Sequence, residues 1–542
     1  MQTAGWDRLK QLRPDSRTIV LTAATVAFLL ICALPAIYMF GSSFASKNGG
    51  FTLANYLRII AEPRQRSLLL SSATLGIGAV LLATTIGAPL GILLARSDVP
   101  FRRVVRILLS VPLVIPPYVL ALSWILLTGP SGVLAHIAGR DVLSPYTYNP
   151  AAAALVLGIA FYPIVMLATE AAARRVNGRL EEAGLLVIPH RSVFFRLTLR
   201  LVSPTVAASA LIVFVLSISE FGVPGLLRVR VFTTEVFTAF AALYDFGAAT
   251  ALALPLLLLV VCAALATKAI IGDQLVSTSR TASEGIHLHL GVVRHVAFAL
   301  VVLLLLACVF LPLSTLMIEA RSLHQIAGAF AQSGSAIRNS LMLSAVGAIA
   351  ITSLGLLMGY QRAHSHSWLA TLQDILFILL FAVPSTVIGM GIIGLWNRPG
   401  LPAQLYTSNL PVLVAYMARF VPVAALMLSA SNRHIPASSE EAARLAGARW
   451  PRTFARIVVP QMRAGIAAAF VVVFIFVFGE LGATVLVAPP GESTLPVRVY
   501  TLIANAPTSD VAALALIQSA IVLLPMGILG LYAHLQGEGK QI

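Results

Sequence analysis

Two glutamates with matching surroundings, Glu181 and Glu441, open the segments of this sequence that are best suited to contact a partner. Each begins a basic, polar stretch between two apolar ones, at residues 181–200 and 441–460. Aligned without a gap, the second stretch follows the first at an offset of 260 positions. Carboxylates and arginines on a short segment can form charge-assisted contacts with a partner. A protein that keeps such a segment twice is expected to present it twice.

Three charged residues, Glu220, Arg419 and Glu480, lie inside apolar stretches, and the same offset relates the two glutamates. A charge at the centre of a bilayer costs about 2.5–3.5 kcal/mol on insertion scales, so each needs a partner or water. Arg419 and Glu480 could form a buried ion pair, whereas no arginine matches Glu220. All three are candidates for a transport pathway or its gate, with a structural ion pair as the alternative for Arg419 and Glu480.

The composition places these residues in a membrane protein. Of 542 residues, 58% are hydrophobic and 11% are charged, whereas soluble domains carry roughly 25% charged residues. Runs long enough to cross about 30 Å of hydrocarbon recur along the chain. We predict an all-α polytopic membrane protein with about 12 transmembrane helices. They are expected at 18–44, 68–95, 104–127, 150–171, 201–227, 248–269, 295–318, 340–360, 369–396, 410–430, 464–487 and 511–535.

The chain divides into two repeats of six spans. Residues 1–272 form the first half, residues 273–292 a polar cytosolic linker, and residues 293–542 the second half. Because six is even, both halves enter the bilayer in the same orientation, so the repeats are parallel rather than inverted. Val111-Pro112 in the third run is expected to correspond to Val383-Pro384 in the ninth.

The net charge of +16 reflects topology rather than nucleic-acid binding. Most basic residues fall in segments that are cytosolic if the N-terminus is cytosolic, which predicts that both termini lie inside. The same residues can contact the anionic lipids of the bilayer. The three cysteines all lie in apolar runs and provide neither a disulfide framework nor metal-ligand spacing, so no metal site is expected.

The segment Glu441-Ala442-Ala443, with Gly447 after it and a hydrophobic end from Ile457 to Pro460, resembles the Glu-Ala-Ala loop of permease subunits of bacterial binding-protein-dependent ABC importers. The stretches from Phe51 to Tyr56 and from Tyr416 to Pro422 are also similar to this family. The resemblance covers nearly the whole chain, as two fused permease units. Such fused permeases are most familiar among iron(III) importers, with aminoethylphosphonate and thiamine importers as relatives.

The resemblance implies specific partners and contacts. Two copies of an ABC ATPase would dock on the loops, a soluble substrate-binding protein would dock outside, and the chain would lie in the bacterial inner membrane. The residues implied in ATPase coupling are Glu181, Glu182, Ala183, Glu441, Ala442, Ala443, Gly447 and Arg449. The first loop departs from the family pattern, because Val187 and Arg200 stand where the family has glycine and proline. Unequal coupling of the two halves is therefore expected.

No Walker A pattern occurs in the sequence, so we expect a permease that is not itself an ATPase and holds no cofactor, with ATP and magnesium on the partner. The predicted function is ATP-driven import of a small solute, with iron(III) as the first candidate and aminoethylphosphonate, thiamine or another organic solute as alternatives. The alternative from another class is an ion-coupled secondary transporter working through Glu220 and Glu480. It accounts for the two membrane carboxylates and leaves the two loops unexplained.

Overall fold

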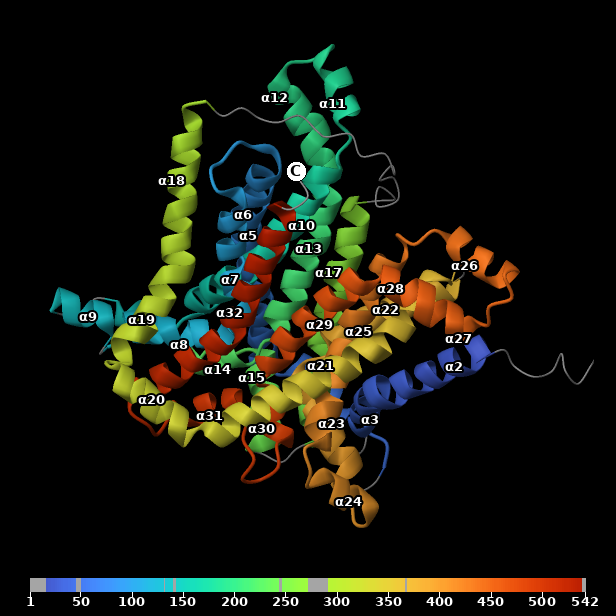
Figure 1. Cartoon of the computed structure of the whole chain (residues 1–542). Helices are drawn as coiled ribbons and strands as arrows, with labels where there is room; N and C mark the ends of the chain where they lie inside the picture. Colours follow the sequence, from blue (N-terminus) through green and yellow to red (C-terminus); the bar gives the residue numbers. More distant parts are fainter. Residues whose placement is uncertain are drawn as a thin grey trace, which may run out of the picture. The chain divides into compact units, whose positions relative to one another are not determined.

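The computed structural model describes residues 16–44, 50–130, 132–139, 143–242, 246–271, 291–365 and 368–538. Across these ranges the chain is built from helices joined by turns and contains no β-strand (Figure 1). The all-α prediction is therefore confirmed. The linker predicted at 273–292 falls, except for its last two residues, outside the described ranges.

In the described part of the chain, nine helices are long and apolar enough to cross a membrane. Two further pairs qualify only if each counts as one bent span: Trp368–Ala382 with Ser385–Trp396, bent by 91°, and Trp450–Gln461 with Arg463–Phe478, bent by 74°. The last predicted run overlaps a shorter apolar helix, Thr508–Leu524. Nine to eleven candidate spans thus stand against about twelve predicted. The nine are Ser16–Ser42, Pro63–Arg96, Pro117–Ala138, Pro150–Arg175, Arg191–Ser219, Gly247–Thr267, Val293–Glu319, Gly334–Ala363 and Leu410–Asn432.

The run predicted at 104–127 is not one continuous helix. It consists of α6 (Arg102–Leu109), α7 (Val111–Val114) and α8 (Pro117–Thr128). Successive prolines cause the last break, because proline lacks an N–H and keeps the preceding residue out of the helical region.

The proline pairing expected from sequence is corrected by this break. Pro116 precedes α8 with φ −54° and ψ 135°, and Pro384 precedes α23 (Ser385–Trp396) with φ −54° and ψ 139°. Both helices have 12 residues. Pro384 therefore corresponds to Pro116, and not to Pro112.

The described chain forms two compact units, and they do not coincide with the two contiguous halves of the sequence. The predicted boundaries at residues 272 and 293 describe the sequence repeats and stay a prediction. The first unit comprises residues 1–52 and 337–494, and the second comprises 53–336 and 495–542. Within the first unit, the helices of residues 16–42 pack on helices of the second repeat.

Contacts between distant parts of the sequence hold each unit together. In the first unit, the Thr25 hydroxyl donates to Gln361 Oε1 at 3.0 Å. In the second unit, the Ser123 hydroxyl donates to the Pro312 carbonyl at 2.9 Å in α19 (Leu311–Glu319). The Tyr118 hydroxyl of α8 donates to Gln518 of α32 (Thr508–Glu538) at 2.6 Å.

In the second unit, two glycines four residues apart bring α5 (Pro63–Arg96) against α10 (Pro150–Arg175) (Figure 1). A Cβ at Gly87 would lie 2.6 Å from the Tyr162 carbonyl oxygen, and one at Gly91 would lie 2.5 Å from that of Met166. Small residues at this spacing let helix backbones approach closely in membranes.

The first unit repeats this contact. Gly355 and Gly359 of α21 (Gly334–Ala363) meet α25 (Leu410–Asn432), where a Cβ at Gly359 would lie 2.8 Å from the Ala425 carbonyl oxygen and from the Ser429 nitrogen. The position of the C-terminal end of α5 or α21, relative to its partner helix, is therefore set by backbone-to-backbone contact in both units.

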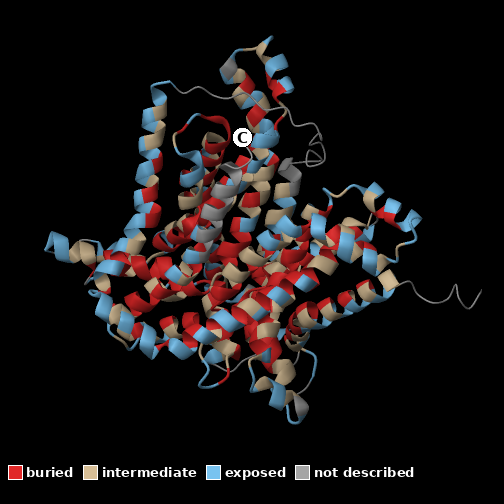
Figure 2. Cartoon of the chain, viewed as in Figure 1, coloured by how far each residue is buried: buried red, intermediate tan, exposed pale blue. Residues whose placement is uncertain are grey.

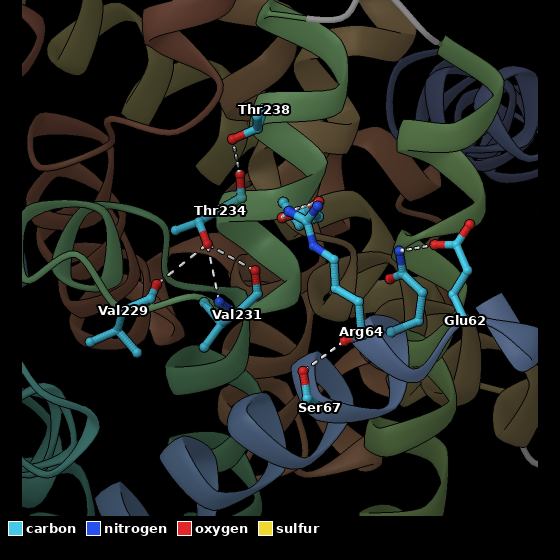
Figure 3. Close-up of polar contacts among 9 residues, drawn as sticks. Glu62, Arg64, Ser67, Val229, Val231, Thr234 and Thr238 are labelled. Atoms are coloured by element: carbon cyan, nitrogen blue, oxygen red, sulfur yellow. Dashed lines mark hydrogen bonds and ion pairs between the residues drawn. The ribbon is translucent and has the colours of Figure 1, made fainter. Parts of the chain in front are cut away.

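The start of α5 is tied to α15 (Phe232–Ala241), which follows the fifth predicted span (Figure 3). Arg64 Nη2 lies 2.7 Å from a Glu235 carboxylate oxygen. The Thr234 hydroxyl accepts from the Val231 N–H at 3.1 Å and so caps the first turn of α15. Because Arg64 is 60% exposed, this ion pair contributes about 0–1 kcal/mol, and it orients α15 more than it stabilises the unit.

Gly359→Ala is expected to destabilise the protein, because the added methyl group meets fixed backbone of α25. Overpacking of this kind typically costs about 1–3 kcal/mol. Gly347→Ala, on the same helix, is the matched control, since its Cβ would have no neighbour closer than 3.5 Å. The measurement is a thermal melt in detergent, and equal melting temperatures for the two variants would contradict the close approach.

Candidate functional site

The first predicted loop folds as three short helical segments, of which the second and third overlap the start of the candidate span Arg191–Ser219. They are α11 (Gly178–Leu185), α12 (His190–Val193) and η3 (Phe194–Thr198), the last with π-helical hydrogen bonding. Asn177 caps α11, because its side chain accepts from the Arg179 N–H at 3.0 Å. An asparagine at this position favours a helix start there.

The second loop has the same three parts. They are α26 (Ala437–Leu445), α27 (Trp450–Thr453) and η6 (Phe454–Val458), which is again π-helical. The two π-helical segments coincide at the expected offset of 260 positions. The correspondence of Phe194 with Phe454 is therefore confirmed.

Glu181 lies on the buried side of α11 and holds this helix to the end of the second span. It is 3% exposed. Arg96 Nη1 donates to its carboxylate at 2.9 Å, and the Thr198 hydroxyl donates at 2.6 Å. Arg96 Nε also donates to the Ala173 carbonyl at 2.8 Å. The contact therefore joins α11 to the C-terminal ends of α5 and α10 and to η3.

The second buried glutamate is Glu440, on the buried side of α26. It is 5% exposed. His364 Nε2 lies 2.9 Å from one carboxylate oxygen, and the Tyr360 hydroxyl donates to the other at 2.7 Å. Trp450 Nε1 donates to the Tyr360 hydroxyl at 3.1 Å. This contact joins α26 to the end of α21 and to α27.

The structure corrects the register of the predicted coupling residues. Glu181 corresponds to the buried Glu440, and the exposed Glu182 corresponds to the exposed Glu441. Because η3 and η6 keep the offset of 260, the first loop is one residue shorter between its buried glutamate and its π-helical segment. Each loop carries two adjacent glutamates, so the sequence permitted either alignment.

The turns after the two helices explain the missing glycine. Gly447 has φ +78°, and beyond it the Ala448 N–H donates to the Ala443 carbonyl at 3.0 Å, which closes α26 with a left-handed residue. After α11 the shorter turn closes differently: the Val187 N–H donates to the Gly184 carbonyl at 3.1 Å with no positive φ at Val187. The first loop therefore has no position that demands glycine.

Both loop helices have a buried side and an exposed side (Figure 2). Large apolar side chains stand free near their C-terminal ends: Leu186 is 88% exposed and Leu445 is 91% exposed. Of the predicted coupling residues, Glu182, Ala183, Glu441, Ala442, Gly447 and Arg449 are exposed, and Glu181 and Ala443 are buried. Exposed leucines flanked by charges form a surface that a partner can cover.

Glu220 directly follows α13 (Leu199–Ser219), and Glu480 follows α29 (Arg463–Phe478) after one residue, Gly479. A Glu220 oxygen accepts from the Gly222 N–H at 3.0 Å. Glu480 accepts from the Ala483 N–H at 3.0 Å, and from the N–H of Thr484 at 3.1 Å and its hydroxyl at 2.6 Å. Each carboxylate thus binds free N–H groups where the chain starts a new short helix.

Arg419 is buried in α25 and lies over the Phe420 ring at 5.7 Å from its centroid. On the same helix, the Tyr416 hydroxyl accepts from the Thr484 hydroxyl at 3.1 Å. Glu480 and Tyr416 are therefore linked through Thr484. Pairing of Arg419 with Glu480, and a role of either in a pathway, stay predictions. Within the described ranges no group of three or more His, Cys, Asp or Glu residues could hold a metal ion.

Sequence reasoning missed a further buried carboxylate near the C-terminal end of α10. Glu170 is 4% exposed and lies 2.7 Å from Arg174 and 3.2 Å from Arg106. The spacing of Glu170 and Arg174, four residues apart on a helix, was the available signal. The contact ties α10 to α6.

Comparison with protein families places the chain. Residues 87–324 and 351–535 match the family model described as the binding-protein-dependent transport system inner membrane component. The chain belongs to this family. The double match confirms two permease repeats, and membership confirms the permease prediction over that of an ion-coupled secondary transporter. The permease is a multi-pass protein of the inner membrane.

Individual relatives cover the permease to different extents. The Fe(3+)-transport system permease protein FbpB 2 of Haemophilus influenzae is 24% identical over 89% of this chain and 93% of its own length. A ferric transport system permease protein, FbpB 1, from the same organism is 23% identical over 93% of this chain and 82% of its own. PhnV of Salmonella paratyphi A, named for 2-aminoethylphosphonate transport, is 31% identical over 30% of this chain and 59% of its own.

Glu181→Gln is expected to destabilise the permease strongly, because it leaves the buried Arg96 guanidinium without its counter-charge. Breaking one partner of a buried pair costs about 3–5 kcal/mol. The neighbouring Glu182→Gln, on the exposed side of the same helix, is the control and should leave the melt unchanged. Equal melting temperatures in detergent would contradict a buried ion pair at Glu181.

Arg419→Met and Glu480→Gln test the predicted ion pair. If the two side chains pair, either change alone lowers the free energy of unfolding by about 3–5 kcal/mol, and the melting temperature falls with it. The double variant then recovers much of the loss. If Glu480 acts only through Ala483 and Thr484, the losses add and the double variant shows no recovery.

Proposed function

We propose that this permease imports iron(III), delivered by a soluble binding protein, and that two copies of a separate ATPase drive it by docking on α11 and α26. The observation that carries the docking is that each loop helix is held by a buried carboxylate yet leaves an apolar tip exposed. A firmly held helix with an exposed apolar end can receive force from a partner and pass it on.

The proposed force path runs through named contacts. Closure of an ATPase dimer moves α11 and α26. Glu181 carries the movement to Arg96 at the end of α5, and Glu440 carries it to His364 and Tyr360 at the end of α21. The helices α5 and α21 then tilt with α10 and α25, to which the paired glycines hold them. The transport pathway then opens to the outside, receives substrate from the binding protein, and opens to the inside again after hydrolysis.

Iron(III) is proposed as the substrate because two relatives named for it match 89% and 93% of this chain. The carboxylates of Glu220 and Glu480 are compatible with a cationic substrate, and their role as pathway or gate residues is part of this proposal. Aminoethylphosphonate is the second candidate, supported by the relative that matches 30% of the chain.

The topology is part of the proposal as well. Both termini are placed in the cytosol, on the same side as the basic loops that contain α11 and α26. The excess of basic residues in these segments supports the placement.

The function is tested by reconstituting the permease in proteoliposomes with its ATPase and binding protein. Uptake of iron(III), presented as a chelate on the binding protein, is expected to require ATP. Aminoethylphosphonate and thiamine are offered in parallel. ATP-dependent uptake of either one, without iron uptake, would identify that solute as the substrate in place of iron(III). Uptake that persists without ATP would overturn the proposed energy source.

Leu445→Asp is expected to reduce ATP-driven uptake by about tenfold or more, because interface anchors are worth about 2 kcal/mol or more. The side chain is exposed, so the melting temperature should stay unchanged. Leu186→Asp, in the shorter first loop, is expected to have the smaller effect. Unchanged uptake in the Leu445 variant would remove α26 as the docking element.

A further inference from the structure

The contact beneath the loop helix is present in both units, but the cation differs. Arg96 holds Glu181 at 2.9 Å, with both side chains about 4% exposed. His364 holds Glu440 at 2.9 Å, with the histidine 26% exposed. Arginine keeps its charge at every physiological pH, whereas histidine changes its charge near neutral pH.

Arg96 and His364 are equivalent positions. Each lies five residues after the second of the paired glycines, Gly91 and Gly359, which contact the partner helix in the same way. Each also faces the first glutamate of a Glu-Glu pair. The exchange of arginine for histidine is therefore a difference at one structural position.

The neighbours of His364 indicate which protonation state this geometry requires. Nε2 lies 2.9 Å from a Glu440 carboxylate oxygen, and Nδ1 lies 2.9 Å from the Tyr360 carbonyl oxygen. A carbonyl oxygen and an oxygen of an ionised carboxylate can only accept. Both ring nitrogens must therefore donate, so the ring is a charged imidazolium when both contacts are made.

The surrounding charges are consistent with an ionised Glu440. The Arg17 guanidinium of α2 (Ser16–Phe28) lies over the Tyr360 ring, at 5.6 Å from its centroid. Burial alone would raise the pKa of the Glu440 carboxyl, but hydrogen bonds from His364 and Tyr360 and the charges of His364 and Arg17 outweigh it, so its pKa lies below the ordinary value.

Two further groups beside this contact, Arg362 and Trp450, have partners of their own. Arg362 is paired with Asp374 of α22 (Trp368–Ala382), with Nε at 2.6 Å from the carboxylate. From α27, Trp450 contributes a neutral indole that donates to Tyr360.

We propose that His364 and Glu440 form a proton-dependent joint that positions α26 for coupling, while Arg96 and Glu181 form its permanent counterpart under α11. The proposal rests on the proposed function, because it assigns a regulation to the same loop helices. His364 is a positioning residue: it acts on the coupling surface through Glu440 and touches neither substrate nor nucleotide.

The direction of the pH effect follows from the two charges. As pH rises, the imidazolium loses a proton, Nε2 or Nδ1 then faces an acceptor without a hydrogen, and α26 loosens. When the pH falls far enough to protonate Glu440, whose pKa is lowered, the carboxylate loses its charge and the ion pair is lost. Between these limits the joint is closed, whereas α11 stays held across the whole alkaline range.

Hydrogen exchange of the full-length permease, measured at about pH 6 and pH 8.5 and corrected for intrinsic exchange rates, tests the joint without the ATPase. Opening of α26 is expected to increase at the higher pH by about fivefold, at the low end of typical coupling factors. The peptides of α11 should not change. His364→Arg should keep α26 protected at both values, and His434→Arg, at an exposed histidine six positions before Glu440 in the sequence, should behave as wild type.

The reciprocal variant Arg96→His moves the pH dependence to α11 and supplies the same test if His364→Arg fails to fold. Protection of α26 that is equal at both pH values in the wild type, or that falls equally in His364→Arg, would overturn the inference. ATP-driven uptake, measured in parallel, should decline with pH less in His364→Arg than in the wild type. Absence of uptake at every pH would count against the proposed function alone, since the exchange result stands without it.

Discussion

The close approach of two backbones at paired glycines determines where everything else in each unit lies. Gly87 and Gly91 on α5, like Gly359 on α21, have no room for a Cβ because backbone atoms of the neighbouring helix occupy the space. A bilayer supplies no hydrophobic drive between helices, so such packing decides their position. The C-terminal end of α5 is thereby fixed against α10, and Arg96 reaches both the Ala173 carbonyl and Glu181.

A buried ionic contact at the base of each loop helix is a poor way to gain stability, because desolvation offsets most of the attraction. It is a good way to fix orientation, because a carboxylate with two defined donors accepts one geometry. Glu181 is held by Arg96 and Thr198, and Glu440 by His364 and Tyr360. An apolar contact of equal area would allow the helix to rock, and a helix that rocks transmits less movement to the spans.

The fold class, the two repeats and the approximate spans were predictable, because long apolar runs admit only helices in a membrane. The equivalence of Glu220 and Glu480 was predictable too, since the offset of 260 holds there. The choice between Glu440 and Glu441 was not, because it depends on a turn that is one residue shorter in the first loop. The contact of Arg96 with Glu181 joins residues 85 positions apart, and no local pattern indicates it. The hydrogen bonds of Glu480 to Ala483 and Thr484 are local and were not predicted, and the pairing of Glu480 with Arg419 stays a prediction beside them.

The two loops differ in three ways that point in one direction. The first has a short turn, a joint between fully charged side chains and almost no exposure at that joint. The second has a left-handed glycine at its turn, a histidine in the joint and more access to solvent. Each difference lowers the free energy needed to move α26, compared with the free energy needed to move α11. In a fused chain the two halves cannot be exchanged for one another, so a rigid half and an adjustable half can be kept. The departures of the first loop from the family pattern are then consistent with a firmer attachment to its own unit, and the adjustable half is the one that keeps the Glu-Ala-Ala pattern.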